Sequence, residues 1–76
     1  MSKRYIEFWH KGIMTGEPIP ACGSDSFAYL DARLSDRNQR EQAAQIARKR
    51  GYIGYRIMAY PILPERALTG LILLDA

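Results

Sequence analysis

The chain has 76 residues, of which 47% are hydrophobic and 25% charged, and its net charge at pH 7 is +3. A chain of this length can stabilise one hydrophobic core, so we expect a single domain over residues 1–76 and exclude a two-domain arrangement. The composition also excludes an intrinsically disordered chain, which would have fewer apolar residues and a larger net charge.

Cysteine and histidine each occur once, as Cys22 and His10. A single cysteine forms no internal disulfide, and this pair does not supply the ligands of a zinc site. The N-terminal residues lack the apolar run of a signal peptide, and the longest apolar segment, residues 71–74, is far shorter than the ~20 residues of a membrane helix. We therefore expect a cytoplasmic protein with no cofactor, no metal ion and no membrane contact.

The first predicted element is a strand over residues 3–9, because apolar side chains alternate there. Its two faces carry Ile6 and Phe8 on one side and Tyr5, Glu7 and Trp9 on the other. After a turn at Gly12, a second short strand is expected to begin at Ile13 and Met14. Residues 15–26 contain two prolines and two glycines, which predicts a long connection.

The next segment is compatible with two structures. Every second residue from Ala28 to Leu34 is apolar, which favours a strand, whereas Phe27, Leu30 and Leu34 have helical spacing. We favour a strand over residues 26–30. The alternative is a first helix that runs to Leu34.

A helix is predicted over residues 36–50, because Ser35 and Asp36 are capping residues, no proline follows, and Gly51 comes after a cationic last turn. Asp36 and Gln39 resemble a capping box, in which each side chain satisfies a free backbone donor. The helix is expected to turn Ala43, Ile46 and Ala47 toward the sheet and Arg37, Glu41, Gln45 and Arg48 toward water.

Beyond Gly51, a second alternating segment predicts a central strand over residues 52–60. One face would carry Ile53, Tyr55, Ile57 and Ala59, and the other Tyr52, Arg56, Met58 and Tyr60. Gly54 within this strand indicates a bulge or the close approach of another backbone. Two prolines then break the chain, and residues 67–76 predict a last strand.

These elements predict an α+β fold, with a small mixed or antiparallel β-sheet and one main α-helix, about residues 36–50, packed on one face. A helix placed between two strands allows a crossover, which would make part of the sheet parallel. A single core of this size supplies only ~3–5 kcal/mol of net stability, so partner binding or a homodimer would stabilise the fold noticeably.

Catalytic groups are not evident in the sequence. A nucleophile beside a base, a pair of carboxylates or a metal site would be needed, and the one candidate pair is Cys22 with His10, which lie in unrelated segments. Cys22 also fits the role of a small buried apolar group. The glycine spacing matches neither the dinucleotide-binding nor the P-loop pattern. We therefore expect a protein that is not an enzyme.

Cationic and aromatic residues are frequent between Arg33 and Tyr60, where they could meet an acidic partner. Phosphate neutralisation combined with aromatic stacking is how nucleic-acid surfaces work, and Tyr52 with Arg56 would share one strand face. The ordinary interpretation is that the cations solvate one helix face and that the tyrosines pack on the sheet. The candidate contact residues are Arg37, Arg40, Arg48, Lys49, Arg50, Tyr52, Arg56 and Tyr60.

Large side chains are also numerous for a domain with one helix, which leaves a second sheet face to be covered. The residues concerned are Tyr5, Trp9, Tyr52, Met58 and Tyr60. An aromatic and methionine patch flanked by arginine has the composition of an interface centre. The connecting loop or a second copy of the chain would be alternative covers for this face.

Residues 27–61, which run from "FAYLDARLS" through "QAAQIARKRGYIGYRIMAYP", resemble the small accessory proteins encoded by phages and prophages. The resemblance rests on a strand near an Asp-x-Arg-Leu-Ser turn, an Ala- and Arg-rich helix, and a Gly-Tyr-x-Gly-Tyr-Arg strand. It implies a small binding module that contacts a host protein or ribonucleoprotein complex, in some cases as an inhibitor of host defence such as an anti-CRISPR protein. The basic charge of this chain disfavours DNA mimicry. Direct binding of RNA or DNA is the alternative function.

Overall fold

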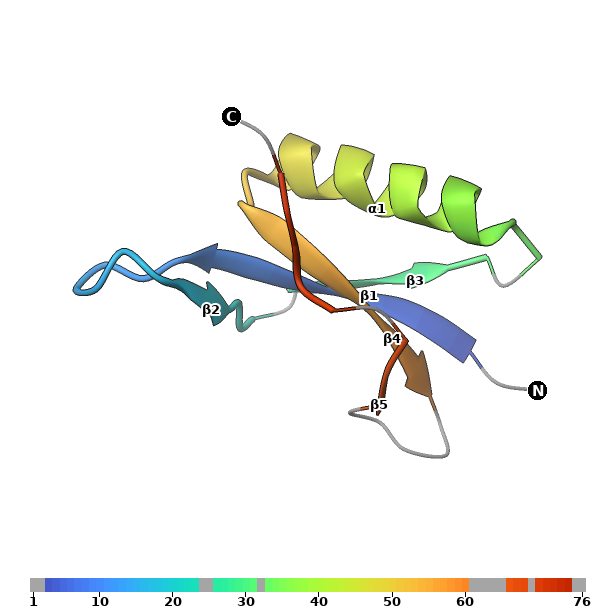
Figure 1. Ribbon diagram of the computed structural model, residues 1–76, viewed down its shortest axis with the longest axis horizontal. Coiled ribbons are helices and arrows are strands. Elements are labelled where there is room, and N and C mark those ends of the chain that lie inside the picture. Colours follow the sequence, from blue (N-terminus) through green and yellow to red (C-terminus); the bar gives the residue numbers. More distant parts are fainter. Residues whose placement is uncertain (1–2, 24–25, 32, 61–65, 69, 75–76) are drawn as a thin grey trace.

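The computed structural model describes residues 3–23, 26–31, 33–60, 66–68 and 70–74. Within these residues, one helix lies on one face of a six-stranded sheet (Figure 1). The elements are β1 (Lys3–Lys11), β2 (Pro18–Pro20), β3 (Phe27–Leu30), α1 (Asp36–Arg50), β4 (Gly54–Tyr60), β5 (Arg66–Ala67) and β6 (Ile72–Leu73). The predicted α+β fold is confirmed.

Two long strands, β1 and β4, form the centre of the sheet. They pair antiparallel from Lys3 opposite Tyr60 to Trp9 opposite Gly54. The other edge of β1 carries both β2 and β3, and the other edge of β4 carries both β5 and β6. Each central strand therefore has two short strands as its outer neighbours.

All the strand pairs among the described residues are antiparallel, so the expectation of a parallel part was wrong. The helix does connect two strands of the same direction, because β3 and β4 both run antiparallel to β1. β1 lies between them, and the crossover of α1 therefore passes over an intervening strand instead of joining neighbours.

The predicted last strand over residues 67–76 is confirmed only in part, because the structure has two short strands there, β5 and β6. Four residues separate Ala67 from Ile72, whereas only two separate their partners Met58 and Tyr55 in β4. The extra residues interrupt the ladder in the manner of a β-bulge, so β5 and β6 pair with opposite ends of the same strand. The two prolines that were expected to break the chain lie outside the described residues.

The first hairpin differs from the prediction. Ile13 and Met14 do not begin a strand but lie in the turn that follows β1, where both are exposed. The returning strand is β2, which falls inside the segment expected to be a connection. Its two prolines are tolerated because β2 is a short edge strand.

The segment after this connection is a strand, as favoured, and the helical alternative was wrong. β3 pairs with β1 and ends at the buried Leu30. A turn follows, in which the Asp31 carboxylate accepts a hydrogen bond from the Arg33 backbone N–H and the Asp31 carbonyl accepts one from Leu34. This local pairing of an aspartate with the next backbone donors ends the strand.

Helix α1 has the predicted bounds, and its N-cap is Ser35, whose hydroxyl accepts a hydrogen bond from Asn38 N–H. The predicted capping box of Asp36 and Gln39 does not form. Gln39 instead turns inward, and its exposed fraction is 1%. The helix ends at Gly51, which has the expected left-handed conformation with φ at 82°.

The core lies between α1 and one face of β1, β3 and β4. Its buried members are Ile6, Phe8, Leu30, Ala43, Ala47, Tyr55 and Ile57, and Ile46 packs at its border. The small alanines let the helix lie close to the sheet, as predicted. Ile6 and Phe8 share this face with Tyr55 and Ile57 because they are cross-strand partners.

Candidate functional site

The sheet face turned away from α1 is the candidate binding surface, and we call it the open face. Side chains along a strand alternate between faces, so the residues next in sequence to the core residues project to this second side. The cross-strand register assigns to it Tyr5, Glu7, Trp9, Phe27, Tyr29, Arg56, Met58 and Leu73. Among these, Met58 is only 2% exposed, so the accessible part of the open face lies over β3, β6 and part of β1.

Three side chains at the centre of the open face hold one another in place. The Trp9 indole Nε1 donates a hydrogen bond of 2.9 Å to Glu7 Oε1. Arg56 Nη1 lies 3.8 Å from the same oxygen, and the Arg56 guanidinium carbon lies 5.8 Å from the centre of the Trp9 ring. A cation over an aromatic ring and a carboxylate between them fix the orientation of Trp9 and Arg56.

Two aromatic rings on β3 extend this surface toward the sheet edge. Tyr29 is 64% exposed and Phe27 43% exposed, and their rings meet edge to face with centroids 5.8 Å apart. On the opposite edge, Leu73 of β6 is 56% exposed. Sequence reasoning placed Phe27 and Tyr29 in a strand but did not assign them to a surface. Their alternation with Ala28 and Leu30 was the available signal.

The predicted contact residues do not form one surface. Arg37, Arg40, Arg48 and Lys49 are exposed on α1, as expected, and Arg37 pairs with Glu41 at 3.5 Å. Arg56 lies across the sheet from them on the open face. The cations of the helix and the guanidinium of Arg56 are therefore on opposite sides of the molecule.

Arg50 and Tyr52 belong to the helix side. The Tyr52 ring stacks on Phe8 with centroids 4.9 Å apart, and the Arg50 guanidinium lies 5.3 Å from the centre of the Phe8 ring. Arg50 also donates a hydrogen bond to the Phe27 carbonyl at 3.2 Å. The expectation that Tyr52 and Arg56 share one strand face was wrong, because Tyr52 precedes β4 and packs on the core. The side chain of Tyr60 lies outside the described residues.

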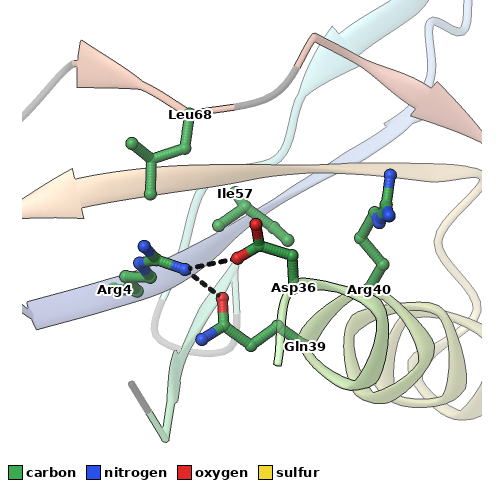
Figure 2. Close-up of a pocket in the computed structure, with 6 residues that line it drawn as sticks. All are labelled: Arg4, Asp36, Gln39, Arg40, Ile57 and Leu68. Carbon is green, nitrogen blue, oxygen red and sulfur yellow. Dashed lines mark hydrogen bonds and ion pairs between the residues drawn. The ribbon is translucent and has the colours of Figure 1, made fainter. Parts of the chain in front are cut away.

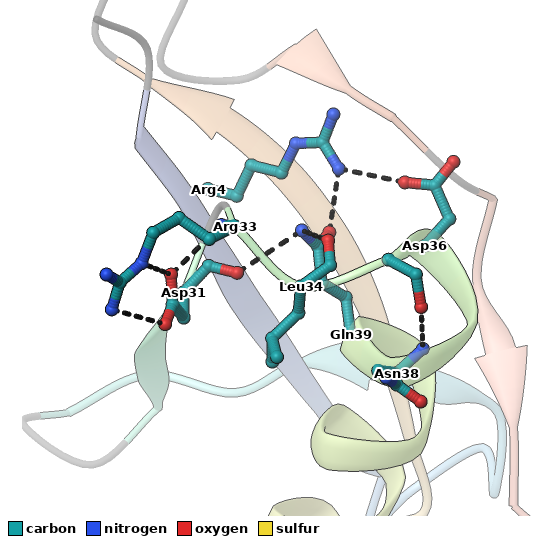
Figure 3. Close-up of polar contacts among 8 residues, drawn as sticks. Arg4, Asp31, Arg33, Leu34, Asp36, Asn38 and Gln39 are labelled. Atoms are coloured by element: carbon teal, nitrogen blue, oxygen red, sulfur yellow. Dashed lines mark hydrogen bonds and ion pairs between the residues drawn. The ribbon is translucent and has the colours of Figure 1, made fainter.

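A polar cluster joins the start of α1 to β1, and sequence reasoning missed it. The Gln39 side chain accepts a hydrogen bond from Arg4 Nη1 at 2.7 Å and donates to the carbonyls of Leu34 at 3.0 Å and Asp31 at 3.4 Å (Figure 3). Arg4 also pairs with Asp36 at 3.0 Å. The signal was the spacing of Gln39, Ala43 and Ala47, which puts Gln39 on the buried side of the helix.

Beside this cluster lies a pocket of about 240 Å³ between α1 and the sheet (Figure 2). It is lined by Arg4, Asp36, Gln39, Arg40, Ile57 and Leu68. Arg4 is already bound to Asp36 and Gln39, as the dashed lines in Figure 2 show. Arg4, Asp36 and Gln39 thus stabilise the junction between the helix and the sheet.

Asp31, Arg33 and Tyr55 have shifted pKa values, and the hydrogen bond with Asp31 raises the pKa of Arg33. Hydrogen bonds from the Arg33 side chain and backbone lower the pKa of Asp31, which stays ionised and anchors the turn after β3. Burial raises the pKa of the Tyr55 hydroxyl, and the nearby charges of Arg40 and Arg48 oppose that shift.

Cys22 is exposed, so its predicted role as a buried apolar group was wrong. His10 contacts the Lys11 carbonyl through Nδ1 at 3.2 Å and is paired with Ile19 in the hairpin, whereas Cys22 follows the end of β2. Over the described residues, no three acidic, histidine or cysteine side chains come together that could hold a metal ion. No helix in the same residues has the length and apolar character needed to span a bilayer.

Comparison with family models, with curated proteins and with solved structures gave no match.

Proposed function

We propose that the chain is a non-enzymatic module that acts in the cytoplasm by binding another protein through its open face. The observation that carries the proposal is the group of Trp9, Arg56, Phe27 and Tyr29 on the sheet face without the helix. Aromatic residues and arginine are enriched at the centres of protein interfaces and provide most of their binding energy.

The rigidity of this surface supports the same function. Trp9 and Arg56 are held by Glu7 before any partner arrives, and Phe27 and Tyr29 are held by a regular strand. Binding then costs less side-chain entropy than it would with free side chains. The module needs no catalytic group to act, which agrees with an inhibitor of a host protein or ribonucleoprotein complex of the kind that the phage resemblance implies.

The distribution of charge favours a protein over a nucleic acid as the partner. Binding of single-stranded nucleic acid combines aromatic rings and cations on one surface. Here the exposed rings lie on the open face, where the charge of Arg56 is offset by Glu7, and the exposed cations of α1 lie on the other side. Around Trp9 and Arg56, the open face is therefore aromatic and close to neutral.

The test is affinity purification from the native host with matched variants. Phe27→Ser combined with Tyr29→Ser removes the exposed rings, and Arg48→Glu is the control on the helix. We expect the partner to be lost with the first variant and kept with the second, with both variants folded by circular dichroism. Retention by the ring variant together with loss by Arg48→Glu would assign the contact to the helix instead.

Two further measurements separate the alternatives. Labelled RNA and DNA are titrated at about 50 mM and about 200 mM salt, where a nucleic-acid binder making several phosphate contacts loses affinity steeply. Light scattering gives the oligomeric state. Tight, salt-dependent binding would replace the proposal with the nucleic-acid function, and a dimer that dissociates in the ring variant would make a second copy the occupant of the open face.

A further inference from the structure

The pocket between α1 and the sheet combines charged, amide and apolar side chains. Its polar lining residues come from β1 and α1 and its apolar ones from β4 and the segment after β5, namely Arg4, Asp36, Gln39 and Arg40 and then Ile57 and Leu68. Gln39 and Ile57 are buried, whereas Asp36 and Arg40 are exposed. The pocket therefore has a buried floor and a charged rim that faces solvent.

Arg40 is the charged residue of the pocket that the fold does not use. Arg4 is bound to Asp36 and Gln39, and these three residues stabilise the junction between helix and sheet. The Arg40 guanidinium, by contrast, has neither a hydrogen bond nor an ion pair with any residue that the structure describes. Figure 2 shows it at the opposite end of the pocket from Arg4. The pocket thus contains one guanidinium that is available to a ligand.

The charges of the pocket favour an anion over a cation. Its two guanidinium groups and one carboxylate leave a net positive charge. Asp36 is already bound by Arg4 at 3.0 Å, so a cationic ligand would have to compete with that contact. An anion would instead meet Arg40, and a guanidinium binds a carboxylate through two parallel hydrogen bonds. A single available guanidinium suits a carboxylate better than a phosphate monoester, which carries about −1.5 to −2 charges at pH 7.

The apolar side chains and the volume of the pocket define the rest of the ligand. Leu68 is 41% exposed, so an apolar group placed against it and Ile57 would remove apolar surface from water. An apolar cavity of about 150 Å³ accommodates benzene. The 240 Å³ of this pocket accommodate a group of that size together with a carboxylate.

We propose that this pocket binds a small organic monocarboxylate, with the carboxylate on Arg40 and the apolar part against Ile57 and Leu68. The ligand would contact α1, β4 and the segment after β5 at the same time, so the site exists only in the folded chain. The pocket lies on the helix side of the sheet, and the proposal does not depend on the protein-binding function of the open face.

The test compares phenylacetate with phenylacetamide, a neutral probe of the same shape, by heteronuclear NMR titration of the purified chain. For a probe of about ten non-hydrogen atoms we expect a dissociation constant of about 1 mM. Phenylacetate should cause saturable shifts at the backbone amides of residues 36–40, 57 and 68. Phenylacetamide should bind about 10-fold more weakly, because it lacks the charge-assisted hydrogen bonds to Arg40.

Three variants separate the charged contact from the apolar one. Arg40→Gln removes the charge and keeps a long polar side chain, and Arg48→Gln is the matched control on the same helix outside the pocket. Arg40→Gln should weaken phenylacetate about 10-fold and leave phenylacetamide unchanged. Arg48→Gln should change neither affinity. Leu68→Ala should weaken both probes by the same factor, because they share the apolar contact.

Thermal unfolding provides an independent measurement. At a phenylacetate concentration of about ten times the dissociation constant, the thermal midpoint should rise by about 5–10 °C, and by much less in Arg40→Gln. The absence of saturable shifts at the pocket, equal affinity for the two probes, or undiminished binding by Arg40→Gln would each overturn the proposal. None of these results would affect the open face, which is tested through Phe27 and Tyr29.

Discussion

Gly54 lets the C-terminal segment approach the central strand closely. A Cβ atom at this position would lie 2.8 Å from the Ile72 carbonyl oxygen and 3.2 Å from the Leu73 side chain. The nearest atom belongs to the backbone, so it cannot move aside as a flexible side chain would. The absence of a side chain at Gly54 is therefore a condition for the pairing of β6 with β4.

We predict that Gly54→Ala lowers the free energy of unfolding by about 2 kcal/mol, because an added methyl group overpacks a close backbone contact. Gly70→Ala is the matched control, since a Cβ there would meet nothing within 4 Å. Urea unfolding followed by circular dichroism gives both values. Equal stability of the two variants would mean that β6 does not pair tightly with β4.

Gln39 has a buried side-chain amide that forms hydrogen bonds through both its oxygen and its nitrogen. Its oxygen accepts from Arg4 and its nitrogen donates to two carbonyls of the turn before α1. We predict that Gln39→Ala costs about 2 kcal/mol of stability, since it leaves these partners unsatisfied at a buried site. Gln45→Ala, on the exposed side of the same helix, should change stability by less than about 0.5 kcal/mol. A comparable loss for both in thermal unfolding would contradict the role of Gln39.

The two sides of the sheet follow from alternation along β1 and β4. This period of two predicted that Ile6 and Phe8 share one face of β1 and that Tyr55 and Ile57 share a face of β4 opposite Arg56, because both strands are regular and paired along their whole length. The same pattern failed at Tyr52, which precedes β4 and stacks on Phe8. Alternation holds only inside the paired segment.

Helix bounds were likewise predictable, since Ser35 and Gly51 determine them locally. Several long-range features were not. β2 depends on pairing with β1 across a turn, and the inward position of Gln39 depends on Arg4, which is 35 residues away. The open face itself becomes visible only when the register of β3 sets Phe27 and Tyr29 beside Glu7 and Tyr5.

Charge reversal on the two sides should have unequal effects. We predict that Arg56→Glu costs about 1–2 kcal/mol of stability, because it sets two carboxylates opposite each other on paired strands and removes the cation over Trp9. Arg48→Glu on the exposed helix end should cost about 0.5 kcal/mol, through its unfavourable position near the helix C-terminus. Chemical denaturation measures both. A larger loss for Arg48→Glu would mean that Arg56 is not held by Glu7 and Trp9.

In the whole molecule, the helix side contains the hydrophobic core and the open face contains the accessible aromatic rings. The helix side buries the core, with Tyr55 at 3% exposure, and directs exposed cations to solvent. The open face leaves aromatic rings accessible. A single helix cannot cover both faces of a sheet, so a domain of this size has one face available for a partner while stability comes from the other.

Because stability comes from one core, ionisation of a buried group should lower the stability of the whole domain. Burial disfavours the charged form of Tyr55 and raises its pKa in the folded chain above the ordinary value of about 10. Between these two pKa values the unfolded chain has released a proton that the folded chain retains, so stability falls as pH increases. The stability contributed by the neutral, buried hydroxyl of Tyr55 is fully present below about pH 10. It is lost as pH rises through the pKa of Tyr55 in the folded chain.

We therefore predict that the thermal midpoint of the wild-type chain falls between about pH 9 and about pH 11, and that Tyr55→Phe reduces this fall. Tyr29→Phe is the control, because Tyr29 is 64% exposed, and it should show the same alkaline loss as the wild-type chain. Scanning calorimetry of the three proteins over this range makes the comparison. If Tyr55→Phe lost stability as steeply as the other two, the alkaline transition would arise from groups outside the core, and the phenol of Tyr55 would have to reach solvent in the folded chain.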